Sequence, residues 1–283
     1  MKYFSLLFLI LLVSACGADE QSPFVDTAKS DLISLARDTG GTHSAIPLQA
    51  NGPDYAYYMY EPGDYANVGE DYPLLIYLHG ISDFGDPVQQ NDLFKVLRNG
   101  PPKLIEEGSW NPEYPMLVAS PQLMITDFDW QPNKVHSFIE HLESKYRVNP
   151  SRIYITGISI GGVGIFEYIR NLGSRAKPAA AVPIAGAGAE NLVSTFGDVP
   201  IWAFHGEDDR VIPFERGSKQ IVDAINAANP KVRALVTTYP GVGHDAWTRT
   251  YDETGMGQEN RLNDPFNRSV FNWMFSKKKS AAD

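Results

Sequence analysis

Gly157-Ile158-Ser159-Ile160-Gly161-Gly162 is the stretch of the sequence that decides the fold. It follows Ile153–Thr156, whose composition is typical of a buried strand, and it precedes Val163–Asn171, which is predicted to form a helix. A Gly-x-Ser-x-Gly between a strand and a helix is typical of a nucleophile elbow, a sharp turn that exposes one serine at the top of a sheet. Glycine suits this turn because the serine has a strained backbone and bulky neighbours would clash. The pattern predicts Ser159 as a nucleophile if the chain also supplies a base and an acid.

The segments around this stretch alternate between apolar strands and helices. In the helix predicted at 134–146, Val135, Phe138, Ile139 and Leu142 share one face and charged residues lie opposite. We expect strands at 55–60, 73–78, 114–119, 153–156, 179–184, 201–204 and 234–239, and helices at 31–38, 101–107, 134–146, 163–171, 215–228 and 263–275. Such alternation predicts an α/β fold with a mostly parallel central sheet and helices on both faces.

The composition is that of an ordinary globular protein, with 43% hydrophobic and 20% charged residues among 283. That length is enough for one large α/β domain. A formal net charge of -10 argues against nucleic acid as a partner, because neutralising phosphates requires basic faces. The basic run Lys277-Lys278-Lys279 lies at the C-terminal tail, where we expect a solvated end rather than a binding patch.

The N-terminus has the features of an export signal. Met1-Lys2 is a short positive region, and Ser5–Val13 is an apolar stretch too short to span a bilayer as a permanent helix. It ends at Val13-Ser14-Ala15-Cys16, which resembles the lipobox of bacterial lipoproteins. Cys16 is the only cysteine in the chain, so an intramolecular disulfide does not explain it. The resemblance implies a lipid anchor on Cys16, and a plain secretory signal that contains a cysteine is the alternative.

These features divide the chain into four parts. We expect a lipoprotein signal peptide at 1–16, a tether and N-terminal extension at 17–44, one catalytic domain at 45–278 and a tail at 279–283. The protein is then exported and lipid-anchored to the cell envelope, or secreted if Cys16 is not lipidated. Gly17 rather than Asp follows the cysteine, so the inner-membrane retention signal of enteric bacteria is absent and the outer membrane is favoured.

A nucleophilic serine needs a general base, and histidine exchanges a proton near neutral pH. His244 follows the strand at 234–239 in a loop that contains glycine, so it leaves the sheet at the same edge as Ser159. His205 is the rival, but it follows its strand directly and precedes the acidic turn, where packing or loop support suits it better. We therefore predict His244 as the base.

The third member of such a triad is a carboxylate that orients the base. An acidic turn follows the strand at 201–204 and holds Glu207, Asp208 and Asp209. The chain order of serine, acid and histidine is the one usual in this kind of sheet. Spacing alone leaves the three carboxylates open as the acid. A metal site in the turn lacks a second ligand cluster in the sequence to support it.

An oxyanion hole is expected from two backbone N–H groups. One belongs to Ile160, directly after the serine, and the other comes from the loop that follows the strand at 73–78. In that loop Gly80 lets the backbone approach a substrate, and the N–H of Ile81 is the candidate donor. The hydrophobic side chains are no obstacle, because the main chain donates.

The chain from about Asp71 to Phe275 resembles the dienelactone-hydrolase and phospholipase/carboxylesterase branch of the α/β-hydrolases. In that branch the acid is the fifth residue of a His-Gly-x-x-Asp loop, which implies Asp209 here; neither a metal nor an organic cofactor is implied. The matching pieces are Leu78-His79-Gly80, Ser120-Pro121-Gln122, Tyr146–Tyr154, Gly157–Gly162, Trp202–Gly206 and Gly243–Trp247.

The resemblance implies a serine carboxylesterase that works through an acyl-enzyme, with Ser159, Asp209 and His244 as its triad. The stretch from Ser159 to Asp209 is too short for a large lid, so we expect a minimal cap and an open site for small or polymer-attached esters, including acetyl or feruloyl esters on polysaccharide. We expect Gln122, Trp130 and Trp247 to line the pocket. The alternatives are a serine peptidase of the prolyl-oligopeptidase type and a non-catalytic surface lipoprotein.

Overall fold

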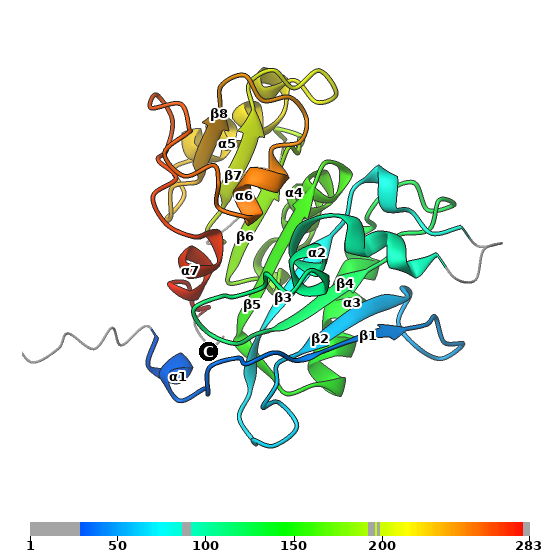
Figure 1. Ribbon diagram of the computed structural model, residues 1–283. Coiled ribbons are helices and arrows are strands. Elements are labelled where there is room, and N and C mark those ends of the chain that lie inside the picture. The colour runs from blue at the N-terminus through cyan, green and yellow to red at the C-terminus, as the bar shows by residue number, and fades with distance from the viewer. Residues whose placement is uncertain (1–28, 87–91, 192–195, 197–198, 280–283) are drawn as a thin grey trace, which may run out of the picture.

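A sheet of eight strands runs through the part of the chain that the computed structural model describes, residues 29–86, 92–191, 196 and 199–279. The strand order is β1-β2-β4-β3-β5-β6-β7-β8. β2 is antiparallel to both of its neighbours, and the other strands pair in parallel. Figure 1 shows the twist of the sheet from β1 to β8. The strands are β1 (Thr42–Ile46), β2 (Tyr57–Glu61), β3 (Tyr72–Leu78), β4 (Leu117–Pro121), β5 (Val148–Ile158), β6 (Ala180–Ile184), β7 (Trp202–Gly206) and β8 (Leu235–Tyr239).

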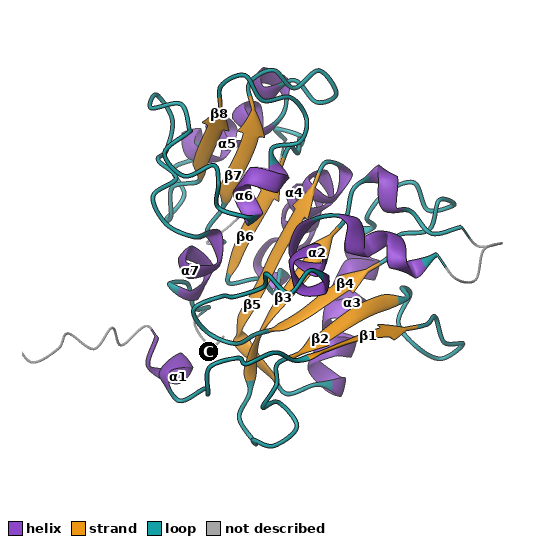
Figure 2. Cartoon of the chain, viewed as in Figure 1, coloured by secondary structure: helices purple, strands orange, loops and turns teal. Residues whose placement is uncertain are grey.

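Helices cover both faces of this sheet. In Figure 2, α2, α6 and α7 lie in front of the strands, and α3, α4 and α5 lie behind them. The α-helices are α1 (Ser30–Ile33), α2 (Gly100–Glu106), α3 (Pro132–Lys145), α4 (Ile160–Leu172), α5 (Ser218–Ala227), α6 (Trp247–Tyr251) and α7 (Val270–Phe275). Short 3-10 helices include η2 (Ile81–Asp83), η3 (Leu93–Arg98), η4 (Gly173–Arg175) and η6 (Phe214–Arg216).

The core lies on both faces of the parallel strands. β3, β4, β6 and β7 are buried along their whole length, which explains their continuous apolar runs. Aromatic rings fill part of one layer, where Trp202 packs against Phe204, Phe266 and Trp273 with ring centroids 4.8 to 5.9 Å apart. The strand order and the two helical layers confirm the predicted α/β-hydrolase fold.

Strand β5 is longer than predicted. Residues 148–151, which we left outside the predicted helices and strands, form its first part, since Tyr72 pairs with Val148 and, after a register shift, Leu74 pairs with Ile153. Pro150 lies in the shifted segment, where it has no N–H to donate to a ladder. Strand β5 therefore begins before the apolar run at 153–156 from which we predicted it.

The closing helix predicted at 263–275 is wrong in its first half, because only α7 is helical. The N–H of Asp264 donates to Val236 O at 2.8 Å, and its carboxylate accepts the N–H of Val236 at 2.8 Å. These bonds hold Asp264 beside β8 instead of in a helix. The helix begins after Ser269, whose Oγ accepts the N–H of Phe271 at 3.2 Å.

The predicted boundary at residue 45 falls inside β1, and the residues just before it are packed on the domain. Leu32 of α1 is only 1% exposed. The carboxylate of Asp31 accepts two hydrogen bonds from the buried guanidinium of Arg152, at 2.6 and 2.8 Å. That pairing holds the pKa of Asp31 well below its usual range. The described residues 29–44 therefore form an N-terminal extension that packs on the domain.

The N-terminal elements were poorly visible in the sequence. α1 covers only residues 31–33 of the helix predicted at 31–38 and begins one residue before it. β1 was missed because it is an edge strand whose side chains are exposed or half-buried, so it has no apolar run. It is held by five antiparallel pairs with β2, from Thr42 opposite Glu61 to Ile46 opposite Tyr57.

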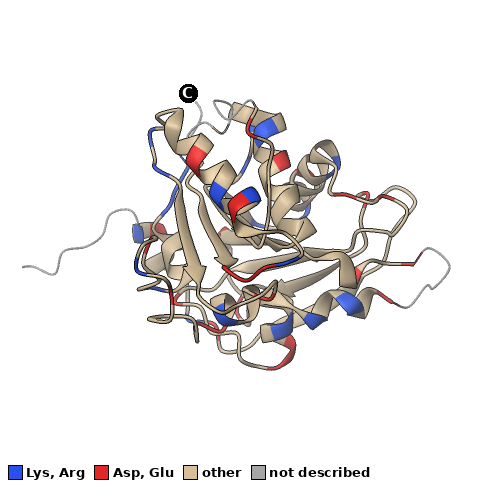
Figure 3. Ribbon diagram, turned by 90° about the horizontal axis from the view of Figure 1, so that it is seen from above, with Lys and Arg blue, Asp and Glu red and all other residues tan. Residues whose placement is uncertain are grey.

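The lysine run near the C-terminus is docked and is not the solvated end that we expected. The N–H of Lys279 donates to Ser151 O at 2.9 Å, and Lys278 Nζ lies 3.2 Å from Asp31 Oδ2. Figure 3, which views the molecule from above, shows basic and acidic residues interspersed over the visible elements.

The predicted signal peptide, its Cys16 and residues 280–283 lie outside the described residues. Among the helices that are described, none has the length and apolar character needed to cross a membrane.

Candidate active site

Ser159 occupies a strained turn between β5 and α4. Its φ of 53° and ψ of -120° place it in a backbone conformation that L-residues rarely adopt. Two glycines make the turn possible, because a Cβ at Gly157 or Gly161 would lie 2.6 or 2.0 Å from Leu78 O. The N–H of Ser159 donates to Ile184 O at 2.9 Å and fixes the turn to β6. The hexapeptide thus forms a sharp strand-to-helix turn of the predicted kind.

A chain of two hydrogen bonds joins Ser159 to a histidine and an aspartate. His244 Nε2 lies 2.8 Å from Ser159 Oγ, and His244 Nδ1 lies 2.7 Å from Asp209 Oδ2. Because a carboxylate only accepts, Nδ1 carries the proton in the neutral ring and Nε2 is left to accept the serine hydroxyl. The structure therefore brings together the three side chains that we predicted as a triad.

The carboxylate of Asp209 is fully buried and well supplied with donors. Oδ1 accepts the backbone N–H groups of Val211 and Ile212 at 2.8 and 3.0 Å, and Oδ2 faces His244. Burial raises the pKa of Asp209, but the hydrogen bonds from His244 and from the two backbone N–H groups outweigh it, so the pKa lies below its ordinary value. Asp209 is thus held as an anion beside the imidazole.

The two neighbouring carboxylates have other surroundings. Glu207 Oε1 accepts from Thr238 Oγ1 at 2.7 Å and from Asn260 Nδ2 at 2.6 Å, which ties the turn to β8. Asp208 is exposed. Among the three acids of this turn, the geometry therefore favours Asp209 as the partner of His244, as the family resemblance implied.

The predicted oxyanion donors flank the serine. Ile160 begins α4, whose N-terminus favours negative charge. Ile81 begins η2, and a Cβ built on the preceding Gly80 would lie 3.6 Å from Ser159 Cβ, so this loop runs beside the serine. The N–H groups of Ile81 and Ile160 make no hydrogen bond to any residue that the structure describes. Both are therefore available to an oxyanion.

His79 orients the peptide that carries the Ile81 N–H, a role that we did not predict. Its Nδ1 lies 2.6 Å from Gly80 O, and its Nε2 accepts the N–H of Leu123 at 2.9 Å. Since a carbonyl only accepts, Nδ1 carries the proton and the ring is neutral. The Gly80–Ile81 peptide is planar and trans, so turning its carbonyl toward His79 points the Ile81 N–H the other way.

Burial lowers the pKa of His79 to about 4 against the opposing hydrogen bond to Gly80, which predicts an acid-sensitive fold. Between pH 6.5 and 4 the unfolded chain binds a proton at this position and the native protein does not, so the stability present above pH 6.5 is lost as pH falls. The loss is on the order of 3 kcal/mol for this group. In His79→Asn, which cannot titrate, urea unfolding should show a pH slope smaller by about one proton in this window. An unchanged slope would contradict the assignment.

Gln122 and Trp130, predicted to line the pocket, are instead buried beneath the oxyanion loop. Gln122 Nε2 donates to Asp83 O at 3.0 Å and to Asp92 O at 3.1 Å. Trp130 Nε1 donates to His79 O at 3.3 Å. Both side chains are at most 3% exposed, so the pocket prediction is wrong for them and their amide and indole N–H groups brace the loop.

Trp247 does lie at the site, where it connects the histidine loop to the oxyanion loop. Its ring meets the ring of His244 edge to face, with centroids 5.3 Å apart. Trp247 Nε1 donates to Asn99 Oδ1 at 3.2 Å, and Asn99 Nδ2 donates to Asp83 Oδ2 at 3.2 Å. We did not select Asn99 from the sequence, because it belongs to no motif and meets Trp247 only in the folded chain.

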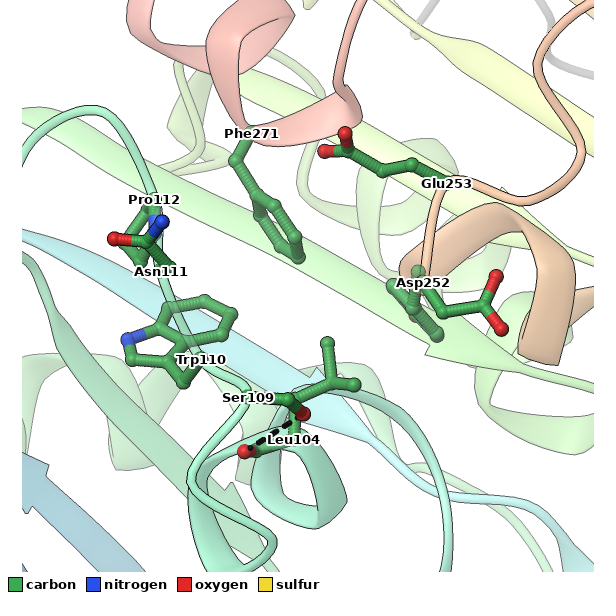
Figure 4. Close-up of a pocket in the computed structure, with 9 residues that line it drawn as sticks. Leu104, Ser109, Trp110, Asn111, Pro112, Asp252, Glu253 and Phe271 are labelled. Carbon is green, nitrogen blue, oxygen red and sulfur yellow. Dashed lines mark hydrogen bonds between the residues drawn. The ribbon is translucent and has the colours of Figure 1, made fainter.

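A separate cavity of about 270 Å³ lies near the C-terminal ends of α2 and α6. Figure 4 shows Trp110, Phe271, Asp252 and Glu253 among the residues that line it. Its lining includes no pair of nucleophile and base like that at Ser159. In the described residues, no group of three or more His, Cys, Asp or Glu side chains is placed to hold a metal ion. The serine site is therefore the candidate active site.

A buried aspartate, a histidine and an elbow serine at the carboxyl edge of this sheet define an α/β-hydrolase. The chain belongs to the dienelactone hydrolase family, whose sequence model matches residues 124–276. That range contains all three side chains. Family and relatives together identify a hydrolase that acts on carboxylic esters.

Two similar proteins have names that state an activity. The chain is 28% identical over 193 residues to carboxylesterase SOBER1 of Arabidopsis thaliana. This match covers 60% of this chain and 82% of that protein. It is 24% identical over 165 residues to the bifunctional acetylxylan esterase/xylanase XynS20E of Neocallimastix patriciarum, which covers 56% of this chain and 22% of that protein.

Two solved structures share the fold. The crystal structure of a thermostable esterase matches with a TM-score of 0.60 at 26% identity, over 84% of this chain and 63% of that chain. The feruloyl esterase module from Clostridium thermocellum matches with a TM-score of 0.54 at 15% identity, over 76% of this chain and 85% of that chain. The second match shows the fold alone.

Proposed function

We propose that the chain is a serine carboxylesterase in which Ser159 is the nucleophile, His244 the general base and acid, and Asp209 the residue that orients the imidazole. One observation carries this proposal: the unbroken hydrogen-bonded chain from Asp209 through His244 to Ser159, with distances of 2.7 and 2.8 Å. Ser159 is 8% exposed and His244 is 20% exposed, so a substrate reaches the serine while the aspartate stays dry.

The geometry supports an acyl-enzyme route. Ser159 Oγ attacks the ester carbonyl while His244 Nε2 takes its proton, and the Asp209 carboxylate stabilises the imidazolium that forms. The N–H groups of Ile81 and Ile160 receive the charge on the carbonyl oxygen. His244 then protonates the leaving alcohol, and water activated by the same nitrogen releases the acid from Ser159.

Acetyl or feruloyl esters carried on polysaccharide are the substrates that we propose. The side chain of Ile81 is 68% exposed beside the nucleophile, and Trp247 stands half-buried against His244. Together they offer an apolar wall to an acyl or aryl group. The acetylxylan esterase among the relatives supports an acyl group on a glycan.

A substrate panel tests the esterase proposal against the peptidase alternative. p-Nitrophenyl acetate and methyl ferulate should be hydrolysed by the purified chain, and aminoacyl p-nitroanilides should be turned over at least about 100-fold more slowly, because an alcohol leaves more readily than an amine. Release of nitroaniline at a rate equal to that of ester hydrolysis would favour the peptidase.

We also propose that the protein is exported and anchored by a lipid on Cys16, with the outer membrane as the favoured site. The support is the sequence Val13-Ser14-Ala15-Cys16 after an apolar stretch. The wild-type chain should incorporate radiolabelled palmitate in a bacterial host and sediment with membranes, whereas Cys16→Ala should do neither. Equal palmitate labelling of the two would contradict the anchor.

A further inference from the structure

A second histidine, His205, contacts the acid of the triad from inside the protein. It is fully buried, and its Nε2 lies 3.1 Å from Asp209 Oδ2, the same oxygen that receives His244 Nδ1 at 2.7 Å. Oδ1 accepts the N–H groups of Val211 and Ile212. Three N–H groups thus donate to the carboxylate, and His205 Nε2, which is hydrogen-bonded to Ile212 O, lies beside Oδ2 as a further close polar contact.

The other contacts of His205 fix which nitrogen carries the proton. Nε2 lies 2.8 Å from Ile212 O as well as near Asp209, and both groups only accept, so Nε2 is protonated. Burial lowers the pKa of His205 below its ordinary value despite those two acceptors, which keeps the ring neutral. Nδ1 then faces the hydroxyl of Ser218 at 2.8 Å, and the single proton of that hydroxyl is shared between Nδ1 and Gly186 O, which lies 3.2 Å from Oγ.

These bonds hold the loop that carries Asp209 and Ile212 against His205 at the end of β7. Ile212 is held at both ends of its backbone, because its N–H donates to Asp209 Oδ1 and its carbonyl accepts from His205 Nε2. The ring of His205 also packs against Phe214, with centroids 5.6 Å apart. The carboxylate therefore cannot rotate away from His244 without breaking several bonds at once.

We propose that His205 is a positioning residue of this site, whose Nε2–H holds the Asp209 carboxylate in line with His244 and draws negative charge from Oδ2. The proposal rests on the proposed triad. It assigns a task to the histidine that sequence reasoning set aside as loop support. The shared oxygen has less negative charge left to stabilise the imidazolium that forms on His244 during catalysis, so removing His205 Nε2 alters the electrostatics at the base.

Three variants separate this task from mere packing. His205→Phe keeps a ring and removes both nitrogens, His205→Gln keeps an N–H donor near the position of Nε2, and Ser218→Ala removes the hydrogen bond on the far side of the ring. In His205→Phe, kcat should fall about 10- to 100-fold with KM nearly unchanged. The acid limb of the kcat/KM profile should move up by about half to one pH unit.

His205→Gln should recover most of the rate and the wild-type acid limb, and Ser218→Ala should keep both even if it lowers the melting temperature. Among the described residues, Asp209 is the titratable group that contacts His244, and His205 lies on the far side of Asp209; the exposed Asp208, Arg210 and Asp245 in the same loops are unchanged in all three variants. A wild-type acid limb in folded His205→Phe, or an equal shift in Ser218→Ala, would overturn the proposal.

The protonation of His205 can also be read in the unmodified protein. Long-range ¹H–¹⁵N NMR correlations should report the Nε2–H form of His205 and the Nδ1–H form of His244 at neutral pH. This measurement does not need turnover, so it separates a failure of the proposed function from a failure of the His205 assignment. A His205 that carries its proton on Nδ1 alone would overturn the proposal, including where His205→Phe does not fold.

Discussion

Ser159→Ala is expected to lower kcat for p-nitrophenyl acetate by roughly 10⁵-fold or more, with binding little changed. The variant removes the only oxygen that His244 Nε2 contacts, at 2.8 Å, among the described residues. The N–H groups of Ile81 and Ile160 remain, so a small rate above the background is expected from oxyanion stabilisation alone.

The fold should survive this change. The backbone N–H of Ser159 donates to Ile184 O, and its carbonyl accepts the N–H of Val163. Alanine keeps both of these hydrogen bonds. The positive φ is already imposed by the turn, so a melting temperature within a few degrees of wild type is expected. Turnover within about tenfold of wild type in a folded Ser159→Ala would place the nucleophile elsewhere.

Asp209→Asn is expected to lower kcat by about 10⁴-fold. The two backbone N–H groups at Oδ1 would fix the amide oxygen on their side, which turns the amide NH₂ toward His244 Nδ1. A donor at that place favours the tautomer with its proton on Nε2, and such a ring cannot accept the Ser159 hydroxyl.

Asp208→Asn is the matched control, since it makes the same chemical change one residue away at an exposed carboxylate. It should stay within about threefold of wild type. Glu207→Gln should also keep most of the activity, because Glu207 Oε1 serves Thr238 and Asn260 rather than the histidine. If Asp208→Asn is the damaging change, the acid is one residue earlier than the structure indicates.

The elements that position the site were predictable because their signals are local. The apolar runs of β3, β5 and β7 mark strands covered on both faces, and parallel strands deliver their following loops to one edge. The position of Ser159 after β5 follows from that rule, and so does the position of His244 after β8. The choice of Asp209 needed the family resemblance, because a turn with three adjacent carboxylates does not reveal which one points inward.

Residues that act through tertiary contacts were missed or misassigned. Gln122 and Trp130 were expected at the pocket, but the side-chain N–H of each donates a hydrogen bond to a backbone carbonyl of the oxyanion loop. Asn99 reaches Trp247 across a sequence separation of 148 residues, which no local pattern reports. For His79 a signal did exist, since it directly precedes the glycine of the oxyanion loop.

The boundaries failed where side chains or edges compete with the local pattern. Asp264 hydrogen-bonds to the backbone of β8, so the chain at this point is not helical, although the apolar residues that follow predicted a helix there. β1 depends on pairing with β2, and its own residues have neither a buried face nor a clear alternation. In both cases, contacts with distant parts of the chain decide the backbone conformation, because the local sequence favours one conformation only weakly.

The most direct test of the triad is covalent labelling of the purified chain with a fluorophosphonate probe, followed by intact-mass measurement and peptide mapping. Only an activated serine reacts readily with such a probe, so the measurement also separates an enzyme from a non-catalytic protein of the same fold. The triad predicts one adduct per chain, on Ser159, and little labelling in His244→Ala. An unlabelled wild-type chain, or an adduct on another residue, would contradict it.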